Sequence, residues 1–252
     1  MKKKFYFLLA AIFSIISQSV HAANGDTFSY TYKGKTINYV VINESSKTCG
    51  TAPGASATSP GTSIDGDVIL PEKPKNGDVE YTLTEIGTWS FASSNLVGIL
   101  IPNSVNKIGS QSFYRCTKLR SVFIGKGITS YIAGAFSGSS SIVKIIKPSN
   151  LGLDSQANPI YKTGYSYDAE LEITDEGVVY ANNRTSIIYV PYSISGTFTV
   201  PASVTTIGEA AFAYSYIDEV VYAGDNVTSI GAGDGVWRDL GEVFKGTGRS
   251  SW

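Results

Sequence analysis

The chain has 252 residues, of which 20 are Lys or Arg, 21 are Asp or Glu and one, His21, is histidine. If residues 1–23 are removed as a signal peptide, 17 bases (20 minus 3) remain against 21 acids, and this net charge of −4 argues against general nucleic-acid binding. The remaining chain would contain no histidine, which excludes a Ser-His-Asp triad, a Cys-His pair and a His-ligated zinc site.

Residues 1–23 have the pattern of a secretory signal peptide. Residues 2–4 are lysines, an apolar run extends from Phe5 to Ile16, and small residues around Ala22 form a cleavage site. The apolar run is shorter than the ~20 residues that cross a bilayer, so cleavage near Ala22 or Ala23 is favoured over a membrane anchor. No later segment is apolar enough to span a membrane. We therefore expect a secreted or cell-surface protein without a membrane span after signal cleavage.

Residues 24–66 do not repeat and are predicted to form an N-terminal β cap with a flexible loop. Residues 28–32 and 36–42 read as two strands around Lys33-Gly34-Lys35, which predicts a β-hairpin. Stacked-coil folds need their first coil covered, because its open end would expose core and a free sheet edge. The alternative is a small independent binding module. Residues 51–66 are rich in Ser, Thr, Gly, Ala and Pro, which is typical of a loop.

Residues 67–148 carry a motif that returns with a period in the low twenties. The motif starts as Ile-Gly and ends in Phe, as in 86–91 and 108–113, and a damaged copy follows at 131–136. An intact copy returns far downstream, at 207–212. Such a period predicts a solenoid, in which stacked coils bury the face that one coil cannot bury alone. We expect one continuous interior, filled by equivalent rings: Phe91, Phe113, Phe136 and Phe212.

After each phenylalanine, apolar residues recur at relative positions 1, 4 and 6, as in Leu96, Ile99 and Ile101. This alternation predicts one strand per coil with one face inward. A glycine follows the motif isoleucine in three of the four copies, which indicates either a positive φ or a close backbone approach.

Two segments resemble the BspA-like subfamily of leucine-rich repeats. They are residues 101–119, which begin Ile-Pro-Asn-Ser-Val, and residues 200–208, which begin Val-Pro-Ala-Ser-Val. The resemblance covers roughly residues 67–231. It implies a mainly β leucine-rich-repeat solenoid with short helical or irregular turns, and a non-enzymatic surface protein exported by bacteria. Several members of that family are adhesins, but fold alone does not fix function.

Residues 149–197 interrupt the period. Residues 176–180 and 186–191 read as a hairpin, and the resemblance implies a hairpin insertion that usually follows an Asn-Pro such as Asn158-Pro159. Residues 198–252 are predicted to hold further repeats, a fifth copy from Val227, and a C-terminal cap.

Two cysteines, Cys49 and Cys116, remain after signal removal. A disulfide is possible in an exported protein. Cys116 falls where, by the resemblance, this repeat commonly carries a buried cysteine, so two unpaired thiols are favoured over one bridge. Neither cysteine has a histidine nearby that could make it a nucleophile.

The strand positions between the inward ones offer a candidate protein-binding face. Leu100, Phe123 and Ile146 would form an outward apolar column, with Arg120 and Lys144 alongside. A contiguous exposed apolar patch usually marks a contact surface. The alternatives are that strands simply favour such residues, or that the inserted hairpin covers the column.

The acidic residues give no metal or catalytic site. Asp225, Asp234 and Asp239 match no calcium loop, and Glu170 with Glu172 share a strand face as ordinary surface acids do. We expect no cofactor and no metal, and we favour a non-enzymatic protein that binds another protein, on a host or bacterial surface, or mediates adhesion. The alternatives are a carbohydrate-binding or polysaccharide-processing solenoid acting through Tyr, Lys or Arg around a groove, and a structural segment of a surface assembly.

Overall fold

The computed structural model describes residues 22–128, 130–131, 134–151, 164–209, 211–212 and 215–231. All regular secondary structure in these ranges is β-strand, so the predicted short helical turns are turns without a helix. Residues 1–21 of the predicted signal peptide, residues 232–252 of the predicted C-terminal segment, and with them His21, Asp234 and Asp239, lie outside the described residues, as does Asn158.

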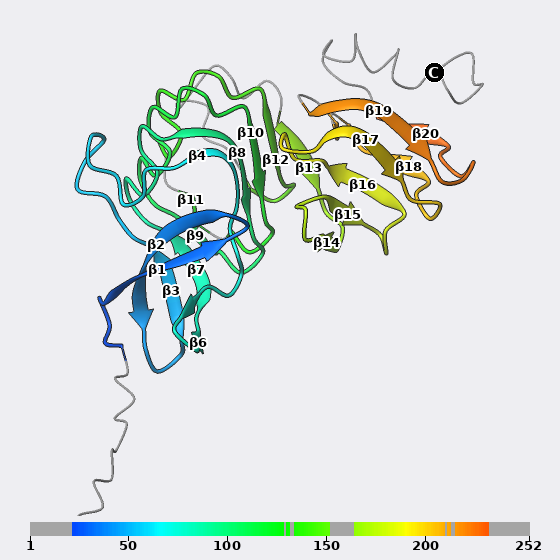
Figure 1. Cartoon of the computed structure of the whole chain (residues 1–252). Helices are drawn as coiled ribbons and strands as arrows, with labels where there is room; N and C mark the ends of the chain where they lie inside the picture. The colour runs from blue at the N-terminus through cyan, green and yellow to red at the C-terminus, as the bar shows by residue number, and fades with distance from the viewer. Residues whose placement is uncertain are drawn as a thin grey trace, which may run out of the picture.

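The first repeat array consists of two sheets that enclose a common core (Figure 1). One sheet has five parallel strands in the order β13-β12-β10-β8-β4, here called the parallel sheet. Its strands are β4 (Asp65–Ile69), β8 (Asn95–Ile101), β10 (Ser121–Ile124), β12 (Lys144–Pro148) and β13 (Gly164–Tyr167). The other sheet contains β1 (Thr27–Tyr32), β2 (Lys35–Asn43), β3 (Thr48–Thr51), β7 (Thr82–Ile86), β9 (Lys107–Ile108) and β11 (Ser130–Tyr131).

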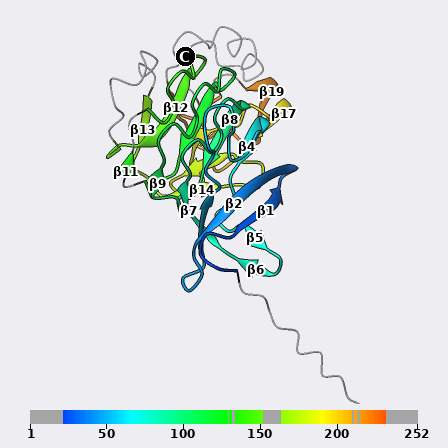
Figure 2. The ribbon, with the colours of Figure 1, turned by 90° about the vertical axis from the view of Figure 1, so that its left-hand side faces the viewer.

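The predicted N-terminal hairpin is confirmed and is continuous with the first array. β1 pairs antiparallel with β2, and Lys33 and Gly34 both adopt positive φ (50° and 74°) in the tight turn between them. β3 then pairs antiparallel with β2 and parallel with β7, so the cap extends the sheet of the coils. Figure 2 shows this end of the molecule with a small ribbon of β5 (Lys75–Asn76) and β6 (Val79–Glu80) beside it.

The first core is held by a ladder of phenylalanine rings. Phe91 and Phe113 stack with centroids 5.5 Å apart, and Phe113 and Phe136 with centroids 4.9 Å apart, both pairs inclined by 8°. Three residues after each ring, a small polar side chain donates to a backbone carbonyl: Ser94 to Thr62 (3.1 Å), Cys116 to Phe91 (3.0 Å) and Ser139 to Phe113 (2.6 Å). These bonds satisfy buried backbone acceptors between coils.

The motif glycines serve close backbone approach. A Cβ on Gly109 would lie 2.7 Å from the Thr88 nitrogen, although Gly109 has no positive φ. The left-handed conformation lies two residues further on, at Trp89, Gln111 and Gly134, with φ values of 57°, 54° and 84°. The third copy therefore has a glycine, Gly134, at the position where the first two copies hold Trp89 and Gln111 in a left-handed conformation that is strained for residues with a side chain.

The second repeat array has its own core, so the expectation of one continuous interior is wrong. Phe212 packs edge-on against Phe198 at 5.2 Å, in a cluster separate from that of Phe91, Phe113 and Phe136. After β13 the chain does not add another coil to the first array but starts a new sheet in the order β14-β15-β16-β18-β20, here called the covering sheet. The strands of the second array are β14 (Leu171–Ile173), β15 (Val179–Ala181), β16 (Ser186–Tyr189), β17 (Ser195–Val200), β18 (Thr206–Ile207), β19 (Tyr216–Tyr222) and β20 (Ser229–Ile230).

Two separate cores predict two kinds of mutational coupling. Phe113→Ala should destabilise the protein by about 3–5 kcal/mol, because it leaves a cavity in a closed core. Phe91 is the stacking neighbour of Phe113, so the free-energy losses of Phe91→Ala and Phe113→Ala should deviate from additivity by more than 0.5 kcal/mol in the double variant. The losses of Phe113→Ala and Phe212→Ala should add. Urea unfolding of the single and double variants measures both, and strong coupling between Phe113 and Phe212 would contradict separate cores.

Candidate functional site

The predicted apolar column lies inside the molecule. Leu100, Phe123 and Ile146 are register partners on adjacent strands and are 2%, 0% and 1% exposed. They form a third buried cluster with Val179 and Tyr189 of the covering sheet and with Tyr167 of β13. The expectation of an exposed column is therefore wrong. The structure shows the alternative, in which the inserted hairpin β15–β16 covers the column.

Aromatic side chains from both sheets meet at the column, Tyr167 from the parallel sheet and Tyr189 from the covering sheet. The Phe123 ring stacks on Tyr167 at 5.6 Å and contacts Tyr189 at 5.8 Å. The Tyr167 hydroxyl donates to the Ile124 carbonyl at 2.6 Å, and the Tyr189 hydroxyl shares a hydrogen bond with Ser121 at 3.1 Å. Both tyrosines thus contribute ring area while their hydroxyls stay hydrogen-bonded.

A polar row crosses the parallel sheet beside the column, in the register Asp67–Gly98–Ser121–Lys144. A Cβ on Gly98 would lie 2.7 Å from the Asp67 carboxylate, so glycine leaves the space that this side chain occupies. Burial raises the pKa of Asp67, since the charged carboxylate loses solvent.

Lys144, predicted as a surface residue, is 1% exposed. Its ammonium donates to the Ala211 carbonyl at 3.4 Å and lies 4.7 Å from the centroid of the Tyr189 ring. Burial lowers the pKa of Lys144 to about 7, because the cation is separated from water. Arg120 remains exposed, as predicted for a flank of the column.

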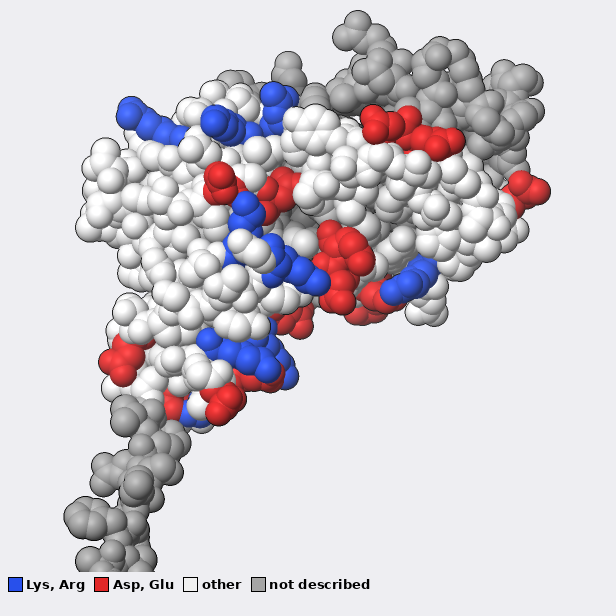
Figure 3. Space-filling view, viewed as in Figure 1, with Lys and Arg blue, Asp and Glu red and all other residues white. Residues whose placement is uncertain are grey.

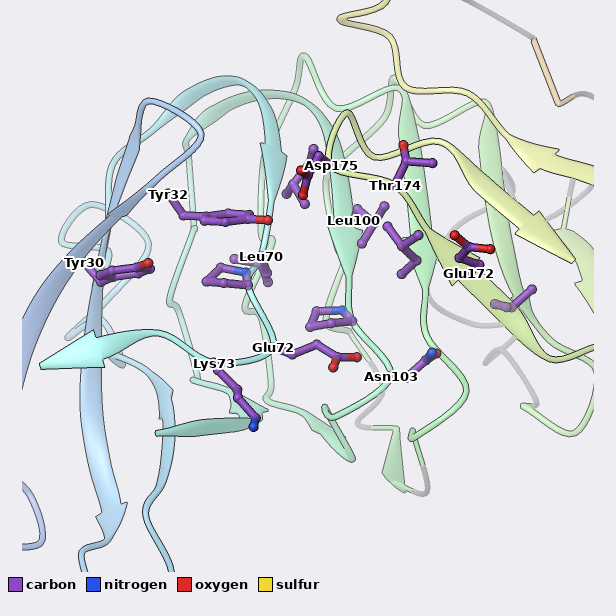
Figure 4. A pocket seen from close by; sticks show the side chains of 15 residues that line it. Tyr30, Tyr32, Leu70, Glu72, Lys73, Leu100, Asn103, Glu172, Thr174 and Asp175 are labelled. Carbon is purple, nitrogen blue, oxygen red and sulfur yellow. The ribbon is translucent and has the colours of Figure 1, made fainter. Parts of the chain in front are cut away.

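A groove of about 480 Å³ opens where the covering sheet ends, and its lining includes one residue of the column, Leu100. Its floor is apolar and comes from the parallel sheet and the segment after it: Ile69, Leu70, Pro71, Leu100 and Pro102. Tyr30 and Tyr32 of β1 form one wall, and residues 171–175 form the other. Figure 4 shows the two tyrosine hydroxyls directed from β1 toward this floor.

Charged side chains surround the groove. Figure 3 shows Lys and Arg gathered with Asp and Glu where the two arrays meet. Lys33 lies 3.8 Å from the Asp175 carboxylate, and the Arg184 Nε donates to Glu172 at 2.9 Å. The guanidinium of Arg184 lowers the pKa of Glu172. Glu72 and Lys73, which follow the floor residue Pro71 in the chain, add one exposed charge of each sign to the rim of the groove.

The groove residues other than Leu100 were not predicted from the sequence as site residues. Tyr30 and Tyr32 looked like ordinary strand residues of a cap. A usable signal was the acid-rich stretch 168–176, which holds five acids and no base. The spacing of residues in the sequence, however, does not predict that this stretch lies next to the β1–β2 hairpin, which is more than a hundred residues earlier in the chain.

The described residues contain no group of three or more His, Cys, Asp or Glu side chains arranged to hold a metal ion. In the same ranges no helix is long and apolar enough to cross a membrane. Cys49 and Cys116 are buried and unpaired, as favoured from the sequence, and burial raises the pKa of each thiol to about 12.

The stacked coils and their repeated phenylalanine motif define a leucine-rich-repeat protein. The profile of the BspA type leucine rich repeat region matches six copies, in residues 73–157 and 191–233, which together make up half of the chain. The chain belongs to this BspA-type leucine-rich-repeat family.

Several solved structures are similar to this chain. A leucine-rich repeat protein from Bacteroides capillosus has a TM-score of 0.42 and 20% identity, over 52% of this chain and 94% of its own. The pneumococcal vaccine antigen PcpA has a TM-score of 0.31 and 14% identity, over 84% of this chain and 67% of its own. A leucine-rich cell surface protein from Faecalibacterium prausnitzii has a TM-score of 0.29 and 17% identity, over 83% of this chain and 74% of its own. No curated protein matches the chain.

Lys144 should make stability depend on pH above neutrality. Between the folded pKa of about 7 and the unfolded value of 10.5, the unfolded chain binds the proton more tightly, so stability should rise with pH. The slope is at most about 1.4 kcal/mol per pH unit. Urea unfolding from pH 7 to 8, below the ionisation of the cysteines and tyrosines of the unfolded chain, should show this rise in the wild type and in the control Lys147→Met. Lys144→Met should lack it, and an unchanged slope in that variant would contradict the assignment.

The two thiols should not react in the native state. Since only the thiolate is nucleophilic and both pKa values are near 12, a thiol reagent at pH 8 should label neither Cys49 nor Cys116 until urea unfolds the chain. Mass spectrometry of labelled protein with and without urea measures this. Labelling of either cysteine without unfolding would show that its burial is incomplete.

Proposed function

We propose that the chain is an exported, non-enzymatic leucine-rich-repeat protein that binds another protein at the cell surface, with the groove as its binding site. Residues 1–23 direct export, residues 24–66 cap the solenoid, and the segments 67–148, 149–197 and 198–252 supply the repeats, the insertion and the closing cap.

The observation that carries this proposal is the convergence of three units on one groove. The cap contributes Tyr30 and Tyr32, the first array contributes the apolar floor, and the second array contributes residues 171–175. An apolar centre with a polar rim suits protein recognition, and tyrosine is a frequent anchor at such contacts.

The groove modifies the binding face expected from the sequence. Leu100 lies beneath the groove floor and is 2% exposed, so the open part of the floor comes from its half-buried register partner Ile69. Phe123, Ile146 and Lys144 support the site from the interior, where the covering sheet withholds them from a partner. Arg120 is exposed but does not line the groove, and we propose it as a second, separate point of contact with the partner.

Carbohydrate binding is the second candidate function. It requires acids, a lysine and tyrosines around one groove, and Glu72, Lys73, Tyr30 and Tyr32 line this one. Both candidates use the same residues, so the nature of the captured ligand separates them.

The paired variant Tyr30→Ala/Tyr32→Ala tests the groove. It should weaken capture of a surface-protein partner at least tenfold, since it removes both aromatic contacts of one wall. Tyr216→Ala, which removes a tyrosine that is 60% exposed outside the groove, should leave capture unchanged. Quantitative pull-downs with the mature chain, run against surface proteins and against polysaccharides, measure both. Equal loss in the two variants, or none in either, would remove the groove from consideration.

A further inference from the structure

One edge of strand β14 borders the groove and pairs with no other strand of the described residues. Within the described residues β14 pairs only with β15, at the end of the covering sheet. The Thr174 nitrogen donates to Val178 across this pair at 2.9 Å. Because antiparallel residues alternate in direction, Glu172 also points its backbone groups toward β15, whereas Leu171 and Ile173 point theirs outward.

The covering sheet leaves the edge strand β4 of the parallel sheet only partly covered. Ile69 on β4 is the register partner of Leu100 and lies next to the end of the column, but it is only half-buried. The β14–β15 turn contacts it at Gly177, where a Cβ would lie 2.7 Å from the Ile69 side chain. An added strand beside β14 would therefore lie over the part of the floor that the covering sheet leaves open.

The groove has a volume of about 480 Å³, and each residue of an extended segment laid along it would advance by about 3.3 Å. Side chains of an added strand would alternate between the apolar floor and the solvent side.

The charge of this edge favours a basic occupant. Residues 168–176 hold five acids and no base, while Glu72 and Lys73, which also line the groove, add one charge of each sign. Three of the five acids already pair with Lys126, Lys33 and Arg184 from other elements. The rest of the acidic charge, together with the short length of β14, disfavours indiscriminate strand pairing and repels acidic chains.

We propose that the groove binds an extended peptide segment of its protein partner by strand addition to β14. The segment alternates basic and apolar residues: its backbone pairs with Leu171 and Ile173, and its apolar side chains fill the floor over Ile69. This inference deepens the proposed function and rests on it, because it names how the same groove recognises a partner.

A synthetic peptide tests the backbone contact on the wild-type protein. The probe is a fluorescein-labelled octapeptide of alternating lysine and valine, compared by anisotropy with two isomers N-methylated on all lysines or on all valines. Strand addition uses one peptide edge only, so one isomer should bind like the parent and the other at least tenfold more weakly. Equal affinity of both isomers and the parent would overturn the proposal.

Two variants test the edge of β14 itself. Ile173→Pro removes the outward N–H without breaking the β14–β15 pairing, since proline is tolerated where that N–H faces away from the sheet. Ile173→Ala removes more side chain yet keeps the N–H. Peptide affinity should fall at least tenfold in Ile173→Pro and less than threefold in Ile173→Ala. Circular dichroism and urea unfolding check that both variants fold.

The outcomes separate this proposal from the broader one. If Ile173→Pro binds the peptide and the protein partner normally while Tyr30→Ala/Tyr32→Ala loses the partner, strand addition is overturned and the groove remains the site. If no peptide binds but the groove retains an oligosaccharide, strand addition and protein recognition both fall.

Discussion

The packing of the covering sheet on the column of the parallel sheet is the interaction on which the rest of the structure depends. The strands of the parallel sheet are apolar on both faces, so each face needs a partner. Phe91, Phe113 and Phe136 fill the inner side, while Tyr189 and Val179 close the outer one. Without that cover, a continuous apolar patch would face solvent. The same packing sets where the second array sits and where the groove begins.

The two arrays show how side-chain identity follows the cover. In the first array the column position holds Phe123 and Ile146, which are buried. In the second array the same position holds Thr199 and Val221, register partners on β17 and β19, and both are exposed. The repeat therefore keeps its inner face constant and adapts its outer face to whatever lies against it. This adaptation gives one end of the first array a half-open floor at Ile69, beside a strand edge that carries acidic charge.

Much of the fold could be predicted from local patterns. The phenylalanine period predicted stacked coils, and the hairpin around Lys33-Gly34 follows from its turn residues. Cys116 was expected in a buried slot, and the structure shows that Ser94 and Ser139 occupy the same slot in neighbouring coils, each donating to a carbonyl. These features are determined within one or two coils, where spacing in the sequence translates directly into position in space.

The sequence by itself determined the repeat, its inward residues, the hairpins and the family. Only the tertiary structure decided that Phe212, whose motif matches that of Phe113, belongs to a second core, and that Leu100, Phe123 and Ile146 are covered. The reason is physical. A period encodes how each coil contacts the next, but it does not encode how a sheet packs on residues that lie far away in the chain. The groove arises from that long-range packing, because Tyr30, Leu70 and Leu171 meet only when the second array docks on the first.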